Sequence, residues 1–152
     1  MPEQAAREAD RSEAVEDYVR AIFHTARGPR RVASTTLVAS FLGVTPTSVT
    51  GMFKKLARLE LVAYAPYRGV SLTSAGQVLA LRLTRRHRLL VLFLAETLDA
   101  SADRISVEVD RLAHHVSPEL EKLIAARFEE PTLDLDGDAP PAADADRSGR
   151  PV

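Results

Sequence analysis

Residues 34–59 read STTLVASFLGVTPTSVTGMFKKLARL, and this stretch decides the fold. The apolar spacing from Ser34 to Phe41 predicts a short helix that stops at Gly43. Thr45 then stands at an N-cap position, and Pro46 at the first position of a second helix. Two short helices joined by a glycine-containing turn are typical of a helix-turn-helix. The apolar residues of the second helix follow at helical spacing: Val49, Met52, Phe53, Leu56 and Leu59.

The segments on either side complete this unit. Two short strands are predicted from Leu61 to Ala65 and from Val70 to Leu72, so a hairpin follows the helix-turn-helix. A helix that begins at Ser12 precedes it, with two acids in its first turn. Residues 12–73 therefore form a winged helix-turn-helix with a small β-hairpin wing.

The rest of the chain is helical or polar. Thr73 caps a long helix to about Leu98, a second helix runs from Ala102 to Val116, and Ser117 caps a third. Residues 74–130 are thus a helical domain, and the fold class is mainly α. We expect residues 1–11 to be a disordered N-terminus and residues 131–152 an acidic disordered tail, because neither has enough apolar residues to order itself.

The formal net charge of -1 conceals an uneven distribution. Between Arg20 and Leu90 there are twelve Lys or Arg and a single acid, Glu60, which makes a net charge of +11. The remaining segments carry eight bases and twenty acids. This asymmetry indicates nucleic acid as a partner, and a recognition helix contacts bases near its N-terminus. We expect these residues to contact double-stranded DNA: Arg30, Arg31, Thr45, Thr47, Ser48, Thr50, Lys54, Arg58 and Arg68.

The composition excludes several classes of protein. Without cysteine there is no disulfide, thiolate zinc site or cysteine nucleophile, so a metal must be held by His, Asp or Glu. The longest apolar run, from Leu89 to Ala95, is too short to span a membrane. The acidic N-terminus does not resemble a signal peptide. We therefore expect a cytoplasmic protein with no membrane partner.

Four motifs together resemble the diphtheria-toxin-repressor family, with the manganese transport regulator branch as the closest match. They are SEAVEDYVRAI from Ser12, LGVTPTSVT from Leu42, YRGVSLT from Tyr67 and RHRLL from Arg86. The resemblance covers about residues 12–141 and implies a homodimeric repressor of metal-uptake genes. Such a repressor binds a palindromic operator when it holds a divalent cation. The resemblance also makes the helical domain the metal-binding and dimerisation domain, in a two-domain member that lacks the SH3-like domain of longer relatives.

The family's metal motif maps onto Asp17, His87, Asp110 and His114. Asp110 and His114 are four residues apart, a spacing that places both on one face of a helix. Oxygen and nitrogen ligands without sulfur favour Mn(II), while Fe(II), Co(II) and Zn(II) stay open. A cation held by three helices would fix the angle between the DNA-binding unit and the dimerisation domain.

The chain departs from the family pattern at two positions where the manganese branch has further carboxylate ligands. These positions hold Arg20 and Ala113. Arg20 lies one turn beyond Asp17, so one hypothesis is a single metal ion beside a fixed arginine charge. The alternative is a decayed site, in which Arg20 pairs with Asp17 and Asp110 and the regulator does not depend on metal. Other expected ligands are also replaced, by Val91, Ser106 and Asp136.

Two further functions are compatible with the same residues. A winged-helix regulator of the MarR type would respond to a small apolar molecule, and metal would leave its DNA binding unchanged. A small metal-dependent hydrolase would use the four metal-motif residues around an activated water. No general base remains beside those residues and no glycine-rich phosphate loop is present, so we do not expect an enzyme. His24 lies on the same helical face as Asp17 and is an alternative ligand.

Overall fold

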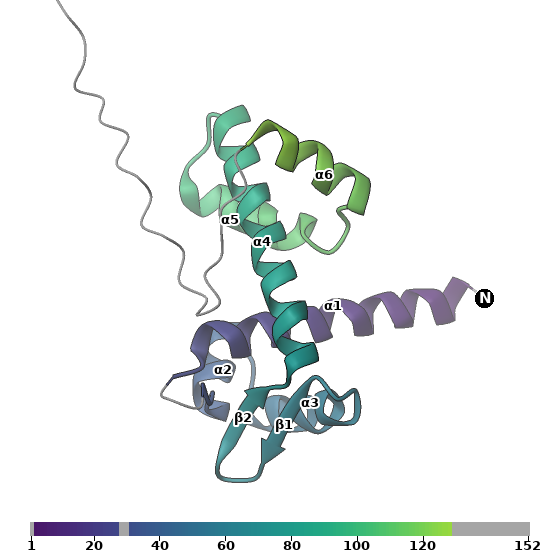
Figure 1. Cartoon of the computed structure of the whole chain (residues 1–152), viewed down its shortest axis with the longest axis vertical. Helices are drawn as coiled ribbons and strands as arrows, with labels where there is room; N and C mark the ends of the chain where they lie inside the picture. Colours follow the sequence, from purple (N-terminus) through teal and green to yellow (C-terminus); the bar gives the residue numbers. More distant parts are fainter. Residues whose placement is uncertain (1, 28–30, 129–152) are drawn as a thin grey trace, which may run out of the picture.

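The computed structural model describes residues 2–27 and 31–128, and it is mainly α-helical. In Figure 1 the long helix α4 joins a lower unit, which contains the β-hairpin, to an upper unit of two helices. This arrangement confirms a winged helix-turn-helix followed by a helical domain. The elements run in the order α1 (Pro2–Thr25), α2 (Thr35–Leu42), α3 (Pro46–Arg58), β1 (Val62–Ala65), β2 (Gly69–Leu72), α4 (Ser74–Thr97), α5 (Ala102–Leu112) and α6 (Pro118–Arg127).

Local capping interactions set the bounds of the helix-turn-helix. The Ser34 hydroxyl accepts the N–H of Leu37 at 3.1 Å and caps α2. Gly43 ends α2 with φ 67°, a left-handed conformation that glycine adopts without strain. The Thr45 hydroxyl accepts the N–H of Ser48 at 3.3 Å and caps α3. These bounds agree with the sequence prediction because each signal lies within a few residues of the helix end that it specifies.

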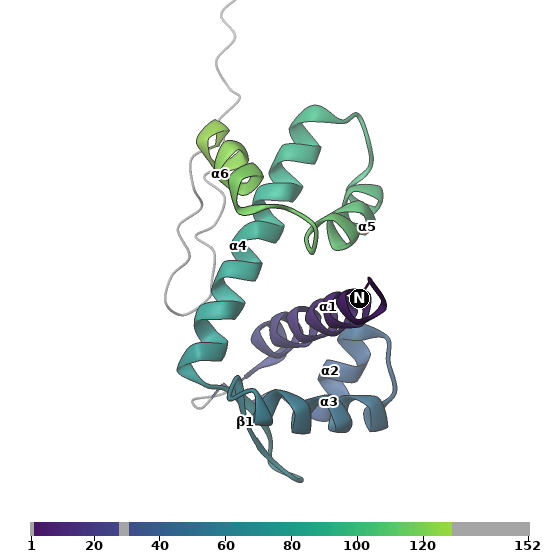
Figure 2. The same cartoon turned by 90° about the vertical axis from the view of Figure 1, so that its right-hand side faces the viewer.

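The wing is one antiparallel hairpin that is tied to the rest of the unit. Val62 pairs with Leu72, and Ala65 pairs with Gly69 across the turn. A bridge between Ala33 and Val70 attaches the segment before α2 to strand β2 of the wing, one residue from the pair that closes the turn. The wing is therefore anchored on two sides, while its turn projects from the end of the molecule remote from α5 and α6 (Figures 1 and 2).

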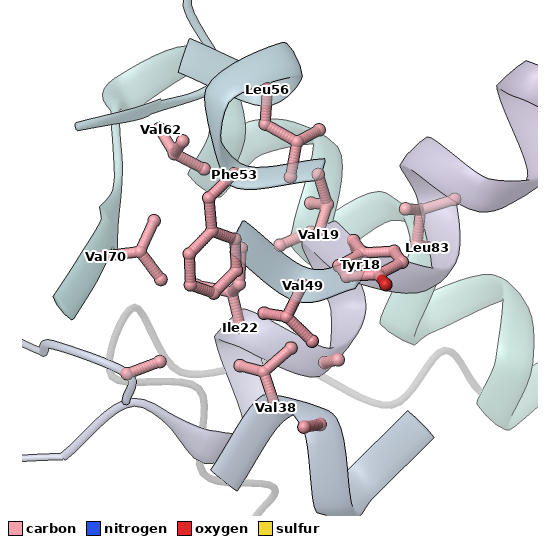
Figure 3. Close-up of a cluster of buried hydrophobic side chains, with 14 residues drawn as sticks. Tyr18, Val19, Ile22, Val38, Val49, Phe53, Leu56, Val62, Val70 and Leu83 are labelled. Atoms are coloured by element: carbon pink, nitrogen blue, oxygen red, sulfur yellow. The ribbon is translucent and has the colours of Figure 1, made fainter. Parts of the chain in front are cut away.

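The core of the winged helix-turn-helix unit gathers around Phe53 of α3, which is fully buried (Figure 3). Ile22 from α1, Val38 from α2 and Val70 from the wing belong to the same cluster. The first half of α4 closes it with Leu83. Burying side chains of this size stabilises the fold by about 1.5–3 kcal/mol each, so α1, the helix-turn-helix, the wing and α4 hold one another in place.

The second half of α4 belongs to a separate core. Leu89 and Leu90 of α4 pack with Ile105 and Val109 of α5 and with Ile124 of α6. One helix thus contributes to both cores, and α1 and α5 face each other beside it (Figure 2). The space between these two helices is where the two units meet.

The N-terminal helix begins ten residues earlier than predicted. α1 starts at Pro2, so the expectation that residues 1–11 are disordered is wrong for residues 2–11. The segment EQAAREA after Pro2 consists of strong helix formers, and proline suits the first position of a helix. Because this segment lacks an apolar stripe, hydrophobic periodicity alone does not predict its helix. The predicted tail over residues 131–152 and Asp136 lie outside the described residues.

Helix α5 ends earlier than predicted, at Leu112 instead of Val116. His114 therefore lies in the turn directly after the helix, and its side chain still lines one cavity together with that of Asp110. The N–H of His115 bonds the carbonyl of Leu112, which tightens the chain into a turn. Ser117 precedes a proline and is extended, with ψ 153°, so α5 cannot continue into α6.

In the described part of the chain, no single helix is long and apolar enough to cross a membrane. The bent pair α2 and α3 meets such a test by length and composition alone. The apolar side chains Val38, Val49 and Phe53 of that pair are fully buried in the core.

Candidate metal centre and nucleic-acid interface

His114 lies between two consecutive carboxylates of α1. Its Nε2 is 3.0 Å from Oδ1 of Asp17, and its Nδ1 is 2.9 Å from Oε2 of Glu16. The His114 side chain is 11% exposed. If Nδ1–H donates to Glu16, Nε2 is the nitrogen that could bind a metal, and Asp17 lies beside it at 3.0 Å. A carboxylate behind the imidazole orients histidine ligands in this way in metal sites.

Asp110 of α5 contacts α1 and α4 at the same time. Its Oδ1 lies 3.2 Å from Nη2 of Arg20 and 3.2 Å from Nε2 of His87. The Arg20 side chain is 18% exposed, and its buried Nε has no hydrogen-bond partner among the described residues. The ion pair between Arg20 and Asp110 is the one that the decayed-site alternative expected.

Three of the four sequence-predicted ligands line one small cavity between α1 and α5. The cavity has a volume of about 20 Å³ and is lined by Asp17, Asp110 and His114, among others. This volume accommodates one water-sized species. The fourth predicted ligand, His87, lines a larger cleft of about 540 Å³ that shares Asp17 and Asp110 with the small cavity.

The donor set fits a divalent cation, although the side chains are paired with one another instead of arranged around one point. Carboxylate and imidazole donors suit first-row divalent metals, and Mn(II) in particular accepts carboxylate oxygens. Among the described residues, however, no three His, Asp or Glu side chains converge closely enough to hold an ion as they stand. Binding would require the Asp17–His114 and Arg20–Asp110 contacts to rearrange.

Burial shapes the protonation of these groups. It raises the pKa of the Asp17 carboxyl, against the lowering effects of His114 and Arg20. It lowers the pKa of His87, an effect to which the Arg20 charge adds and which Asp110 opposes. His87 is thereby kept in the neutral form that binds metals. The Asp17 carboxylate is about half exposed, and a nearby positive charge would stabilise its ionised form.

His24, the alternative ligand, is engaged elsewhere in the larger cleft. Its ring stacks on Phe41 of α2 with 5.9 Å between centroids and meets Phe23 edge-on at 5.7 Å. Burial lowers its pKa, and the Arg20 charge adds to that effect. His24 therefore belongs to the packing between α1 and α2.

Two residues of this site were missed by sequence reasoning. Glu16 contacts His114 as described above, and Arg86 of α4 fixes the turn that carries His114. Arg86 donates from Nη1 to the Ala113 carbonyl at 3.2 Å and from Nε to Glu121 at 3.1 Å. The sequence offered two signals, the run of two acids at 16–17 and the position of Arg86 directly before the predicted ligand His87, whereas Glu121 is distant from every predicted ligand except those of the α5 region.

The predicted DNA-contacting residues of α3 lie on its exposed face. Thr47, Ser48, Lys54 and Arg58 are exposed. On the opposite face the predicted stripe is buried at Val49, Phe53 and Leu56, while Leu59 is 50% exposed. Gly51, within the exposed face, has no neighbour within 4 Å of an added Cβ, so a duplex can approach the backbone there.

Two hydroxyls of the predicted set already serve the helix itself. Thr45 caps α3 and lies 3.0 Å from the Ser48 hydroxyl, and Thr50 donates to the Pro46 carbonyl at 3.1 Å. Their oxygens keep accepting capacity for a partner.

The remaining predicted DNA contacts lie around the wing. Arg68 is exposed in the hairpin turn. Arg31 is exposed in the segment that bridges to strand β2 of the wing, with φ 46°. Arg30 lies outside the described residues.

Comparison with known proteins matches nearly the whole chain to two family models. Residues 10–70 match the N-terminal DNA binding domain of the iron dependent repressors. Residues 73–142 match the metal binding and dimerisation domain of the same family. The boundary between the two matches falls just before α4, the long helix that contributes to both cores.

Individual relatives agree with these matches. The chain is 37% identical over 109 residues to an uncharacterized HTH-type transcriptional regulator of Methanocaldococcus jannaschii, covering 72% of this chain and 87% of the relative. It is 37% identical over 105 residues to the HTH-type transcriptional regulator MntR of Bacillus subtilis, covering 68% and 71%.

Among solved structures, the chain is similar to a manganese-dependent transcriptional repressor in complex with manganese, with a TM-score of 0.70 and 31% identity. That match covers 83% of this chain and 61% of the other. The structure of the manganese regulator SloR matches with a TM-score of 0.66 and 33% identity, covering 77% and 54%. The chain thus spans little more than half the length of these solved proteins.

Proposed function

Since the chain belongs to the iron-dependent repressor family of metal-dependent transcriptional repressors, we propose that it represses metal-uptake genes when a divalent cation lies between α1 and α5. The observation that carries this proposal is the cavity lined by Asp17, Asp110 and His114, at the junction of the two units. The family regulates transcription and is not a family of enzymes. We place its action in the cytoplasm, on double-stranded DNA.

The ligand positions support a role for metal in orienting the DNA-binding unit. A bound cation would be coordinated by carboxylate and imidazole groups from separate helices. Asp17 belongs to the helix that packs on α2 and α3, whereas Asp110 and His114 belong to the α5 region. Drawing these groups to one point restricts the angle between the units, and a ligand that favours one angle shifts the population towards it. Glu16 and Arg86 hold His114 in position for this role.

We assign Asp17, His87, Asp110 and His114 as ligands and Mn(II) as the preferred metal, with one ion per protomer. The mixture of carboxylate and imidazole donors supports Mn(II) over softer metals. Arg20 supports the single ion, because its guanidinium already contributes positive charge to Asp110 at 3.2 Å. Calorimetric titration of Arg20→Glu with MnCl2 tests the stoichiometry. A higher stoichiometry or affinity is expected, and an unchanged titration would remove this argument.

We further propose that two copies dimerise through the helical unit. Leu98 and Val107 are each 50% exposed and line an apolar groove of about 620 Å³ together with Leu94 and Ile105. The family's dimerisation domain covers these residues. A two-fold dimer presents two copies of α3, and this symmetry favours a palindromic operator.

The decisive experiment is a metal titration of DNA binding. Fluorescence anisotropy would follow a labelled duplex that the wild-type protein has selected from a random library in the presence of MnCl2. Manganese is expected to tighten binding to this duplex, and each of Asp17→Ala, Asp110→Ala and His114→Ala is expected to abolish the response. His115→Ala is the matched control, because its side chain is 70% exposed and it is the neighbour of the proposed ligand His114 in the sequence.

A metal-independent regulator is the second candidate, and the Arg20–Asp110 ion pair favours it because it joins α1 to α5 without metal. In that case manganese would leave the affinity unchanged, while Arg20→Gln would weaken DNA binding. The same titration therefore separates the two candidates. Equal binding by the ligand variants with and without MnCl2, at the wild-type level, would overturn the metal-dependent proposal.

A further inference from the structure

The tip of the wing has a turn geometry that is unfavourable for the residue it contains. The N–H of Arg68 bonds the carbonyl of Ala65 at 3.0 Å, and Pro66 and Tyr67 are the two central residues of the turn. Tyr67 has φ 64°. A turn with proline first and a positive φ second is of type II, and its second central residue is normally glycine or asparagine. A bulky L-residue at this φ is strained.

The Tyr67 side chain makes no packing contact with the rest of the described chain that would offset this backbone strain. Its relative exposure is 107%, the largest of the exposed large apolar and aromatic side chains. The bend of the hairpin does not itself require a tyrosine, because the following Gly69, at φ 89°, already accommodates the close approach to the Ala33 carbonyl. A strained and fully exposed aromatic ring in a turn that is specified by its neighbours points to a role outside the folded monomer.

The position of Tyr67 indicates which surface the ring would meet. The hairpin projects beside α3, at the end of the molecule remote from α5 and α6 (Figures 1 and 2). Arg68 next to it is exposed, and the segment that carries Arg31 is bridged to Val70, one residue from the pair that closes the turn. A ring flanked by cations favours an anionic partner with apolar or stacking surfaces, which nucleic acid provides.

Groove dimensions restrict how such a tip can engage the duplex. The major groove is about 12 Å wide and admits a helix, whereas the minor groove is about 6 Å wide. If α3 lies in the major groove, the next groove across a phosphate backbone is a minor groove. A hairpin turn that presents one projecting side chain fits the narrow groove, and apolar side chains are used as minor-groove wedges in other proteins.

We propose that Tyr67 is a minor-groove contact of this repressor, with its ring inserted beside the base pairs that flank the α3 site and Arg68 on the adjacent phosphates. The inference rests on the proposed DNA-binding function. It adds a sequence preference outside the major-groove site, because the minor groove distinguishes A·T from G·C by the guanine N2 amino group.

The test uses Tyr67→Asn, because asparagine tolerates the left-handed conformation and removes the ring. Binding to the selected duplex with MnCl2 is expected to weaken about tenfold, the loss typical of one aromatic contact to a base. The thermal midpoint is expected to equal or exceed that of the wild type. The salt dependence of binding is expected to stay unchanged, whereas in Arg68→Ala its slope falls by about one. Tyr67→Phe is expected to retain the affinity.

Base-pair substitution then locates the ring. Hydroxyl-radical footprints of the wild type and Tyr67→Asn define the flanking base pairs that the ring protects. Changing those pairs from A·T to G·C is expected to weaken the wild type and leave Tyr67→Asn unaffected. Changing them to inosine·C, which lacks the N2 amino group, is expected to leave both proteins unaffected.

Three results would overturn the inference. The first is wild-type affinity in Tyr67→Asn, and the second is an equal sensitivity of both proteins to the G·C change. The third is a loss in Tyr67→Asn that is accompanied by a lower thermal midpoint and is not rescued in Tyr67→Phe. Failure of the wild type itself to bind any selected duplex would instead refute the proposed function.

Discussion

Glu16 offers the sharpest test of how the site is built, because it has no place in the predicted ligand set and its only described polar contact is with His114. The contact measures 2.9 Å from Oε2 to Nδ1 in a place where the imidazole is 11% exposed. A hydrogen bond to a charged group contributes about 1.5–3 kcal/mol. Residues that orient metal-ligating histidines typically alter metal affinity by about 10–100-fold, which corresponds to a similar energy.

We therefore expect Glu16→Ala to weaken Mn(II) binding by at least about tenfold. In Glu16→Gln the amide oxygen can still accept the Nδ1–H, so a loss of only about two- to fivefold is expected. Electron paramagnetic resonance of unbound aqueous Mn(II) measures the affinity directly, without DNA. Circular dichroism establishes that the variants are folded.

The matched control is Glu13→Ala on the same helix. Glu13 pairs with His115 at 3.4 Å, but that histidine is 70% exposed and lies outside the cavity. Its removal is expected to leave Mn(II) affinity unchanged, since exposed pairs contribute little. Wild-type affinity in Glu16→Ala, or an equal loss in Glu13→Ala, would refute the assignment of Glu16 as a positioning residue for His114.

Three further predictions concern the core, the pH dependence and the DNA face. Phe53→Ala is expected to lower the free energy of unfolding by about 3–5 kcal/mol, measured by urea denaturation, because the ring is fully buried. Burial and the Arg20 charge lower the pKa of His24 in the folded protein. As the pH falls below about 6.5, His24 is therefore protonated in the unfolded chain before it is protonated in the folded protein. Stability is therefore expected to fall between about pH 7 and pH 5, and His24→Gln is expected to flatten that fall; an unchanged slope would contradict the assignment. Lys54→Ala is expected to weaken binding to all duplexes alike and to reduce the salt slope by about one, whereas a sequence-dependent loss would indicate a base contact.

The helix-turn-helix and wing were predictable because their determinants are local. Ser34 and Thr45 each cap a helix whose first turn lies within three residues, and Gly43 stops α2 through its own backbone conformation. The start of α1 was misplaced for a related reason. Residues 2–11 form a helix by intrinsic propensity, and hydrophobic periodicity alone does not predict a helix that lacks an apolar stripe.

The candidate site was predictable only in part. Resemblance to a family supplied Asp17, His87, Asp110 and His114, and three of these line one cavity. Asp110 and His114 do line the same cavity, but α5 ends at Leu112, so His114 is presented by a turn and not by the helix itself. The turn that follows directs His114 towards α1, and Arg86 secures that turn from α4 through the Ala113 carbonyl.

The amino-acid sequence by itself determined the order of helices and the wing, the position of the DNA-reading face and the separation of a basic block from acidic flanks. These properties depend on residues that are neighbours along the chain or along one helix. Only the tertiary structure decided that His114 lies between Glu16 and Asp17, and that Asp110 is shared by Arg20 and His87. The members of these groups come from α1, α4 and the α5 region, up to 98 residues apart. Their contacts exist because two separate cores orient α1 and α5 along the same long helix, and no local signal in the chain encodes that arrangement.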